Sequence, residues 1–131
     1  MKLFLILSFS LLSISAVGQN DTTKIVYEKI YDLKDGSFHK RTLTLYSNGN
    51  FLFHSYRRIK PDRADENHYA KGTWTEKKDL YLFSTNGITD IDEKHTLNFD
   101  KSRARVFKDG SLKFLNSEIS WVKGMPLDRI K

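Results

Sequence analysis

The sequence predicts an all-β domain, an antiparallel up-and-down meander of about eight or nine strands that closes into a barrel. Apolar and polar residues alternate with a period of two from Ile25 to Trp121, the pattern of strands with one buried face. Turn dipeptides interrupt the alternation about every eight to twelve residues. No segment has the three-to-four spacing of an ordinary amphipathic helix. Short sequential hairpins favour a barrel, which leaves no open sheet edge, over the alternative, a β-sandwich.

Nine segments carry the alternation and are the expected strands. They are residues 24–31, 38–46, 51–57, 68–75, 80–84, 94–99, 103–107, 111–115 and 119–123. The clearest turns between them are Asp35-Gly36, Asn48-Gly49, Asn86-Gly87 and Asp109-Gly110, dipeptides that tolerate a positive φ. Residues 57–67 contain Pro61 and many charges, which predicts a long loop rather than a helical turn.

The hydrophobic pattern also selects the turn type of the hairpin formed by residues 43–53. A two-residue loop would put Phe51 and Phe53 on the face opposite Leu43 and Leu45. A three-residue loop, with Gly49 as a left-handed bulge, pairs Leu45 with Phe51 and Leu43 with Phe53. All four side chains then share one face. Burial therefore predicts the three-residue loop.

The hairpin formed by residues 104–114 has the same solution. With Gly110 as the bulge, Val106 pairs with Leu112 and Ala104 pairs with Phe114, so the four apolar side chains again lie on one face. Two hairpins with the same turn type indicate a meander built from similar units.

The first eighteen residues have the layout of a secretory signal peptide. Lys2 gives a basic tip, residues 3–12 are mostly apolar, and Ala16 and Gly18 are small residues at the −3 and −1 positions. A membrane anchor is the alternative, but a span needs ~20 apolar residues. Cleavage is expected between Gly18 and Gln19, which leaves residues 19–131 as a single domain. A lipoprotein would carry Cys where Gln19 stands, so we expect a secreted or periplasmic product with no lipid anchor or transmembrane span.

Length and composition exclude several classes of protein. The 131 residues allow one domain. A hydrophobic content of 39% with 29% charged residues excludes a disordered chain and a multi-span membrane protein. Loss of residues 1–18 leaves 21 basic against 16 acidic residues, a net charge of +5. This excess favours anionic surfaces, but acidic residues interrupt the basic segments, so we expect no nucleic-acid partner.

Hairpin residues carry a resemblance to a known family. Gly72-Thr73-Trp74, the following Asp79-Leu80-Tyr81-Leu82 and the preceding residues 43–51 resemble the hairpins of small lipocalin-like β-barrel proteins of the bacterial cell envelope. The resemblance spans residues 40–85 and implies a lipocalin-like barrel. Here Gly-x-Trp falls near the fourth expected strand, whereas lipocalins carry it on the first. Physically, Gly72 leaves room for a close neighbour and Trp74 is expected to plug a barrel end or the core.

Motifs for catalysis, metals and cofactors are missing from the sequence. Cysteine is absent, and the chain has no nucleophile elbow, phosphate loop or dinucleotide fingerprint. His54 and His68 lie on neighbouring expected strands but lack the tight spacing of metal ligands. The acidic stretch 90–93 lacks the spacing of a calcium loop. We therefore expect no enzyme, no metal and no cofactor.

A basic cluster in residues 57–63 is the strongest functional candidate. Its arginines would bind a carboxylate, phosphate or sulfated group as bidentate donors, and a second basic group (Lys101, Arg103, Arg105 and Lys108) would add to them if it lay at the same end. The hypothesis is that the loop gates a pocket lined by tyrosines. The alternative is that Asp62, Asp65 and Glu66 neutralise the loop and that the cluster is ordinary solvent-exposed surface. The candidate ligand-binding residues are Arg57, Arg58, Arg63, Tyr56, Tyr69 and Tyr81.

The function expected from these features is that of an exported soluble barrel, a non-catalytic binding or accessory protein of the cell envelope. Its ligand would be small and amphipathic or anionic, held in or over the barrel mouth. The alternative is a protein-interaction module with a filled core that binds an envelope protein or an anionic surface. A ligand barrel should contain an apolar cavity, and an interaction module should have a solid interior and an exposed apolar patch.

Overall fold

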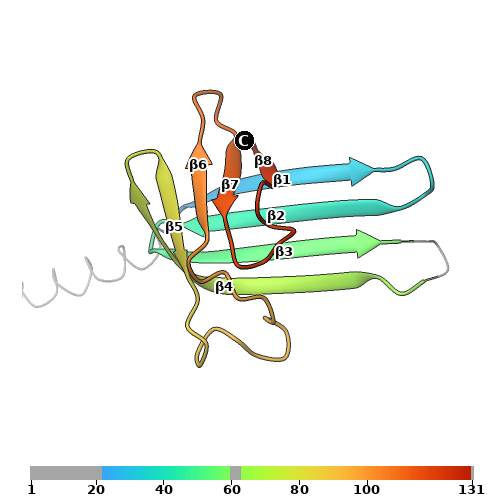
Figure 1. The fold of residues 1–131 in the computed structure, drawn as a ribbon, viewed down its shortest axis with the longest axis horizontal. Coiled ribbons are helices and arrows are strands. Elements are labelled where there is room, and N and C mark those ends of the chain that lie inside the picture. The colour runs from blue at the N-terminus through green and yellow to red at the C-terminus, as the bar shows by residue number, and fades with distance from the viewer. Residues whose placement is uncertain (1–21, 60–62, 131) are drawn as a thin grey trace, which may run out of the picture.

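Eight antiparallel strands follow one another along the chain and close into a barrel in which each strand pairs with its sequence neighbours and the last pairs with the first (Figure 1). The strands are β1 (Lys24–Asp32), β2 (Phe38–Tyr46), β3 (Asn50–Arg58), β4 (Glu66–Lys77), β5 (Leu80–Ser84), β6 (Arg103–Val106), β7 (Leu112–Asn116) and β8 (Pro126–Ile130). The computed structural model describes residues 22–59 and 63–130, which contain no helix. The predicted all-β meander and its closure into a barrel are confirmed.

The two hairpins chosen by burial have the predicted register. Leu45 pairs with Phe51 and Leu43 with Phe53, and Gly49 has a φ of 95°. In the second hairpin, Ala104 pairs with Phe114, Val106 pairs with Leu112, and Gly110 has a φ of 90°. Residues with a side chain rarely adopt this left-handed conformation, which is why glycine stands at both bulges.

Five phenylalanine rings fill the centre of the barrel. Each is at most 2% exposed, and their closest ring centroids lie between 4.8 and 6.3 Å apart. They are Phe51, Phe53, Phe83, Phe99 and Phe114. The interior is therefore packed with side chains, as expected for a barrel of about eight strands.

Two expected strands are wrong and one strand was missed. Residues 94–99 form a loop that starts at a turn around Asp92 and delivers Phe99 into the core. Residues 119–123 form a turn, closed by the Val122 amide donating to the Ile119 carbonyl at 3.0 Å. The missed strand, β8, starts at Pro126, which has no amide hydrogen and is tolerated at the first position of a strand.

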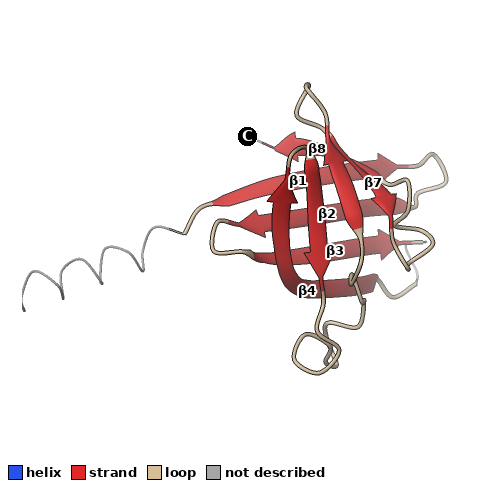
Figure 2. Cartoon of the chain, turned by 60° about the vertical axis from the view of Figure 1, so that its left-hand side comes forward, coloured by secondary structure: helices blue, strands red, loops and turns tan. Residues whose placement is uncertain are grey.

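The strands differ in length, and this difference creates the site. Strands β1 to β4 have nine to twelve residues, whereas β5 to β8 have four or five. The long strands therefore project past the short ones, as Figures 1 and 2 show. Two loops, residues 85–102 and 117–125, border the inward face of this projection, where Leu97 and Trp121 line the same cavity as residues of β2, β3 and β4.

Candidate functional site

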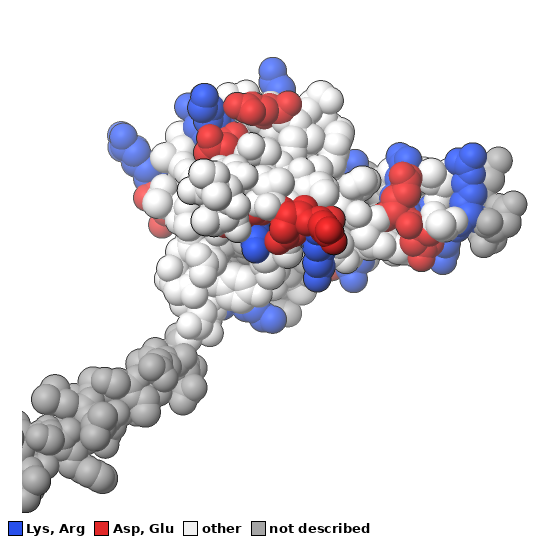
Figure 3. Space-filling model, turned by 90° about the horizontal axis from the view of Figure 1, so that it is seen from below, with Lys and Arg blue, Asp and Glu red and all other residues white. Residues whose placement is uncertain are grey.

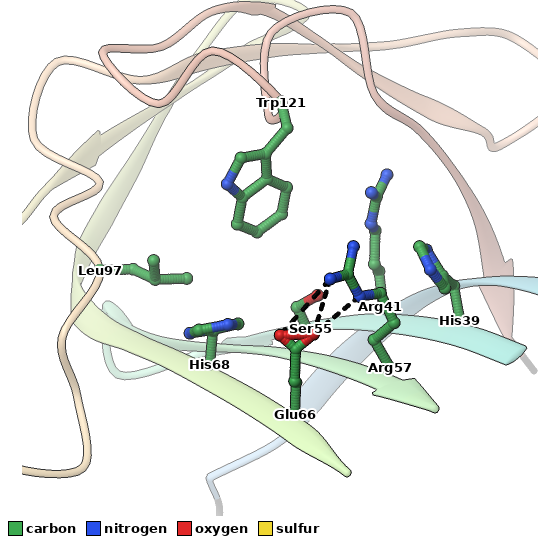
Figure 4. Close-up of a pocket in the computed structure, with 8 residues that line it drawn as sticks. All are labelled: His39, Arg41, Ser55, Arg57, Glu66, His68, Leu97 and Trp121. Carbon is green, nitrogen blue, oxygen red and sulfur yellow. Dashed lines mark hydrogen bonds and ion pairs between the residues drawn. The ribbon is translucent and has the colours of Figure 1, made fainter. Parts of the chain in front are cut away.

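An open cavity of about 290 Å³ lies where the projecting strands leave the closed part of the barrel. We call it the mouth. It is lined by His39, Arg41, Ser55, Arg57, Glu66, His68, Leu97 and Trp121 (Figure 4). The polar side chains rise from β2, β3 and β4, and Leu97 and Trp121 reach it from the two covering loops.

The strand register explains why the mouth is polar. Residues paired across strands share a face, and every second residue along a strand returns to that face. The inward side chains of β1 to β4 therefore form rows, and the first row belongs to the apolar core. From the core outward, the rows are Tyr27, Leu43, Phe53 and Ala70; then Lys29, Arg41, Ser55 and His68; then Tyr31, His39, Arg57 and Glu66.

Arg57 in the outer row is neutralised by Glu66. The Nε and Nη2 atoms of Arg57 donate to Oε1 of Glu66 at 3.0 and 2.6 Å. A longer bond of 3.4 Å joins Nη2 to Oε2, so the ion pair holds both carboxylate oxygens of Glu66, with Oε1 as the main acceptor. Arg57 therefore contributes little uncompensated charge to the mouth.

Arg41 in the middle row has no such partner. Its Nε atom is buried without a hydrogen bond, and no described carboxylate lies within ion-pair distance of the guanidinium. The guanidinium carbon lies 5.2 Å from the ring centre of Trp121 and 5.7 Å from that of Tyr31. Burial, with a smaller contribution from Arg57, lowers the pKa of Arg41. Because arginine stays protonated in proteins, Arg41 is a cation that lies near two rings and has a buried donor without a partner.

His39 in the outer row is shifted toward its neutral form. Burial lowers its pKa, and the charges of Arg41 and Arg57 lower it further, while Glu66 acts in the opposite direction. A neutral imidazole can donate and accept a hydrogen bond. The mouth thus combines one arginine that lacks an acidic partner, the Arg57–Glu66 ion pair, uncharged Ser55, two histidines and an apolar roof.

The three candidate tyrosines do not share a pocket, so that part of the hypothesis is corrected. Tyr56 and Tyr69 point to the outer face of the sheet, because their parity is opposite to that of Phe53 and Ala70. Tyr81 is 5% exposed and lies in the core against Trp74, with ring centres 5.2 Å apart. Burial and a hydrogen bond to Tyr27 raise the pKa of Tyr81.

Tyr56 and Tyr69 instead line a cavity of about 500 Å³ on the outer face, which we call the outer groove. The rings of His54 and Tyr69 are stacked, with centres 4.4 Å apart and planes 2° from parallel. Lys94 Nζ lies 4.8 Å from the centre of Tyr69. The outer groove is separated from the mouth by the thickness of the sheet.

The candidate arginines are also separated. Of the three candidate arginines, only Arg57 lines the mouth. Arg58 points outward over the ring of Phe38, at 5.8 Å, and Arg63 is exposed in the loop. Residues 60–62 of the basic cluster lie outside the described residues, and so do residues 1–18, which the sequence predicts to be a signal peptide.

The second basic group does not reach the mouth either. Lys101, Arg103, Arg105 and Lys108 are absent from its lining, and Lys108 lies in a cavity beside Lys24 at the start of β1. The mouth adjoins the opposite end of β1, because Arg57 pairs with His39 and His39 with Tyr31. On the face in Figure 3, basic side chains stand beside acidic ones without merging into one basic patch.

Of the mouth residues, sequence reasoning proposed only Arg57; it missed Arg41 and Trp121 and considered His68 only as a metal ligand. A usable signal was present for Arg41, which lies in phase with the buried Leu43 and therefore had to face inward. His68 similarly lies in phase with Ala70. Trp121 had no such signal, because residues 119–123 look like a strand.

No described set of three or more histidine, aspartate, glutamate or cysteine side chains is arranged to hold a metal ion. In the described part of the chain, no helix is long and apolar enough to cross a membrane. Comparison of the chain with family models, curated proteins and solved structures finds no significant match.

Proposed function

We propose that this protein is an exported, non-catalytic binding protein of the cell envelope that holds a small anion in the mouth. Export rests on the leader pattern of residues 1–18. The binding function rests on the mouth, and above all on Arg41.

The unpaired guanidinium of Arg41 is the observation that carries the proposal. Buried donors in folded proteins are nearly always hydrogen-bonded, and an unsatisfied one costs free energy. Arg41 has a buried Nε without a partner, and no described carboxylate balances its charge. A bound anion would supply both missing interactions. Two further polar groups of the mouth, Ser55 and His68, lie in the same row as Arg41 and would hold the anion's other oxygen atoms.

The packed interior places this ligand over the barrel rather than inside it. The five phenylalanine rings leave the centre filled, whereas the mouth is open and concave. A ligand there would contact the sheet on one side and the loop carrying Trp121 on the other (Figure 4).

Titration of the purified protein with benzoate, inorganic phosphate and sulfate tests the proposal. We expect at least one of them to bind, and we expect Arg41→Gln to weaken that binding about tenfold or more, because a hydrogen bond to a charged group contributes about 1.5–3 kcal/mol. The matched control is Arg105→Gln, which removes an exposed charge from β6 outside the mouth. Unchanged affinity in Arg41→Gln, with unchanged thermal stability, would refute the proposal.

A second candidate function is a protein-interaction module, favoured by the filled core and by the outer groove. That groove presents stacked aromatic rings beside Leu52, which is 41% exposed, and aromatic side chains are enriched at protein interfaces. This function predicts cross-linking to an envelope protein that Tyr69→Ala abolishes and Arg41→Gln leaves intact. Absence of such cross-linking, together with anion binding that Arg41→Gln weakens and Tyr69→Ala leaves intact, would favour the anion-binding function.

A further inference from the structure

The charges on the inward face of the projecting strands leave one net positive charge to be neutralised. Among the described residues, this face carries three lysine or arginine side chains, Lys29, Arg41 and Arg57. Lys29 Nζ lies 3.4 Å from a carboxylate oxygen of Asp128, and Arg57 is bonded to Glu66. Arg41 alone has no acidic partner. A singly charged anion therefore neutralises the net charge of the mouth, whereas a doubly charged anion leaves one negative charge without a partner.

The roof of the mouth is apolar and held in place. Trp121 lies within the turn of residues 119–123 and is 38% exposed, whereas the next residue, Val122, is fully buried. Backbone hydrogen bonds fix this loop: Val122 donates to Ile119 at 3.0 Å and Gly124 donates to Phe114 at 2.8 Å. The loop thus presents an indole ring to the cavity in a fixed position, beside the free cation of Arg41.

The second apolar wall is equally fixed. The Leu97 amide donates to the Tyr69 carbonyl at 3.0 Å, which anchors the covering loop to β4. Leu97 and Trp121 stand on the loop side of the mouth, and the polar groups stand on the sheet side (Figure 4). An occupant that contacts both sides needs an anionic group and an apolar one.

The volume of the mouth limits the size of the ligand. A volume of about 290 Å³ lies near the lower limit of small-molecule pockets, which is ~300 Å³. A long acyl chain would extend out of this cavity, whereas a molecule with one or two rings fills it.

From these observations we propose that the mouth binds a small, planar, aromatic or conjugated monocarboxylate. Its carboxylate accepts hydrogen bonds from the Arg41 guanidinium, a fork-like donor that matches the two carboxylate oxygens. Its flat apolar part lies against Trp121, because offset aromatic rings attract each other beyond the burial of their area. This inference rests on the proposed anion-binding function and names its ligand class.

Calorimetric titration with a matched set of probes tests the class: 2-naphthoate, 2-naphthalenemethanol, acetate and inorganic phosphate. We expect 2-naphthoate to bind about tenfold or more tightly than the neutral alcohol, which lacks the charge-assisted bonds. We also expect it to bind more tightly than acetate, which lacks the rings, and than phosphate, whose second charge has no partner.

Variants assign the two halves of the ligand to their residues. Trp121→Ala should weaken 2-naphthoate binding about three- to tenfold, in line with an aromatic pair of about 0.5–1.5 kcal/mol, and leave acetate binding unchanged. Trp121→Phe should retain most of the affinity for 2-naphthoate. This result would show that the loop still folds when the indole is replaced by another ring. Phe107→Ala, which removes a ring that is 44% exposed outside the mouth, is the control and should bind like the parent protein.

Two results would overturn the inference in different ways. If phosphate binds more tightly than 2-naphthoate, and Arg41→Gln weakens this phosphate binding, the proposed ligand class is rejected and the anion-binding function is kept. No binding of any of the anions would reject both.

Discussion

Gly72 of β4 packs so closely under the backbone carbonyl of Ser84 on β5 that no side chain fits between them. A Cβ at this position would also lie 2.9 Å from Cε1 of Phe51. The next residue along β4, Thr73, pairs with both β3 and β5. Gly72 therefore stands at the corner where β4 leaves the long sheet and joins the short strands, a position at which glycine is typical of strands.

Gly72→Ala should consequently destabilise the barrel strongly. The added methyl group meets backbone, which cannot rotate away as a side chain can, so we expect a loss of unfolding free energy of about 2 kcal/mol or more. Urea unfolding followed by circular dichroism measures it. The control is Gly87→Ala, where a Cβ meets no atom within 4 Å; equal stability losses in the two variants would contradict the argument.

Phe99 should be the most costly of the five central rings to remove. Its ring contacts those of Phe51, Phe53, Phe83 and Phe114, and the residue is fully buried. Phe99→Ala leaves a cavity among rings that cannot collapse onto one another, which costs about 3–5 kcal/mol.

The same urea experiment compares Phe99→Ala with Phe107→Ala, whose ring is 44% exposed and should cost less than about 1 kcal/mol. A small loss for Phe99→Ala would mean that residues 85–102 do not carry part of the core.

The alternation of apolar residues predicted which way side chains point better than it predicted the backbone. Residues 94–99 alternate because Leu97 and Phe99 face inward, yet the chain there is a loop tied down by Asp92. An extended loop that plugs a barrel has the same period as a strand. The opposite error occurred at β8, where Pro126 and three exposed residues hide a strand with one buried anchor, Leu127.

The sequence predicted the chemistry of the candidate site but not its position. Arginine was expected as the donor for an anion, and the expected site was the loop of residues 57–63 because basic residues are dense there. The mouth arises instead from the unequal lengths of the strands, which expose the inward positions of Arg41 and His39. Strand length depends on where β5 to β8 end, and that is set by tertiary packing that the hairpin pattern does not contain.

Glu66→Gln should increase anion binding. The substitution keeps the size of the side chain and releases Arg57 from its ion pair, so the mouth gains one positive charge. We expect phosphate affinity to rise several-fold at low salt, and more than that of a monocarboxylate, with the gain falling as salt screens it. Calorimetric titration at two salt concentrations measures this.

The same variant should fold almost as stably as the parent, because an exposed pair contributes about 0–1 kcal/mol. Glu118→Gln, an exposed residue outside the mouth, is the control. Weaker phosphate binding in Glu66→Gln would show that Glu66 positions the site rather than neutralising it.

His39 should make the mouth sensitive to pH. Burial and the charges of Arg41 and Arg57 lower its pKa below 6.5 in the folded protein, so near pH 6 the unfolded chain binds more protons at this position. The contribution of His39 to stability is then complete above pH 6.5 and decreases as the pH falls toward the folded-state pKa.

Replacing His39 with glutamine should remove this part of the pH dependence. The difference in unfolding free energy between the parent and His39→Gln, measured in urea at several values between pH 5 and pH 8, isolates the contribution of His39 from that of the other ionisable groups. NMR titration of the His39 ring gives the pKa directly, and it should lie below 6.5 in the free protein.

A bound anion favours the imidazolium form of His39 and offsets the charges of Arg41 and Arg57. 2-Naphthoate should therefore raise the pKa of His39, and its binding should strengthen as the pH falls. A His39 pKa at or above 6.5 without ligand would contradict the electrostatic description of the mouth.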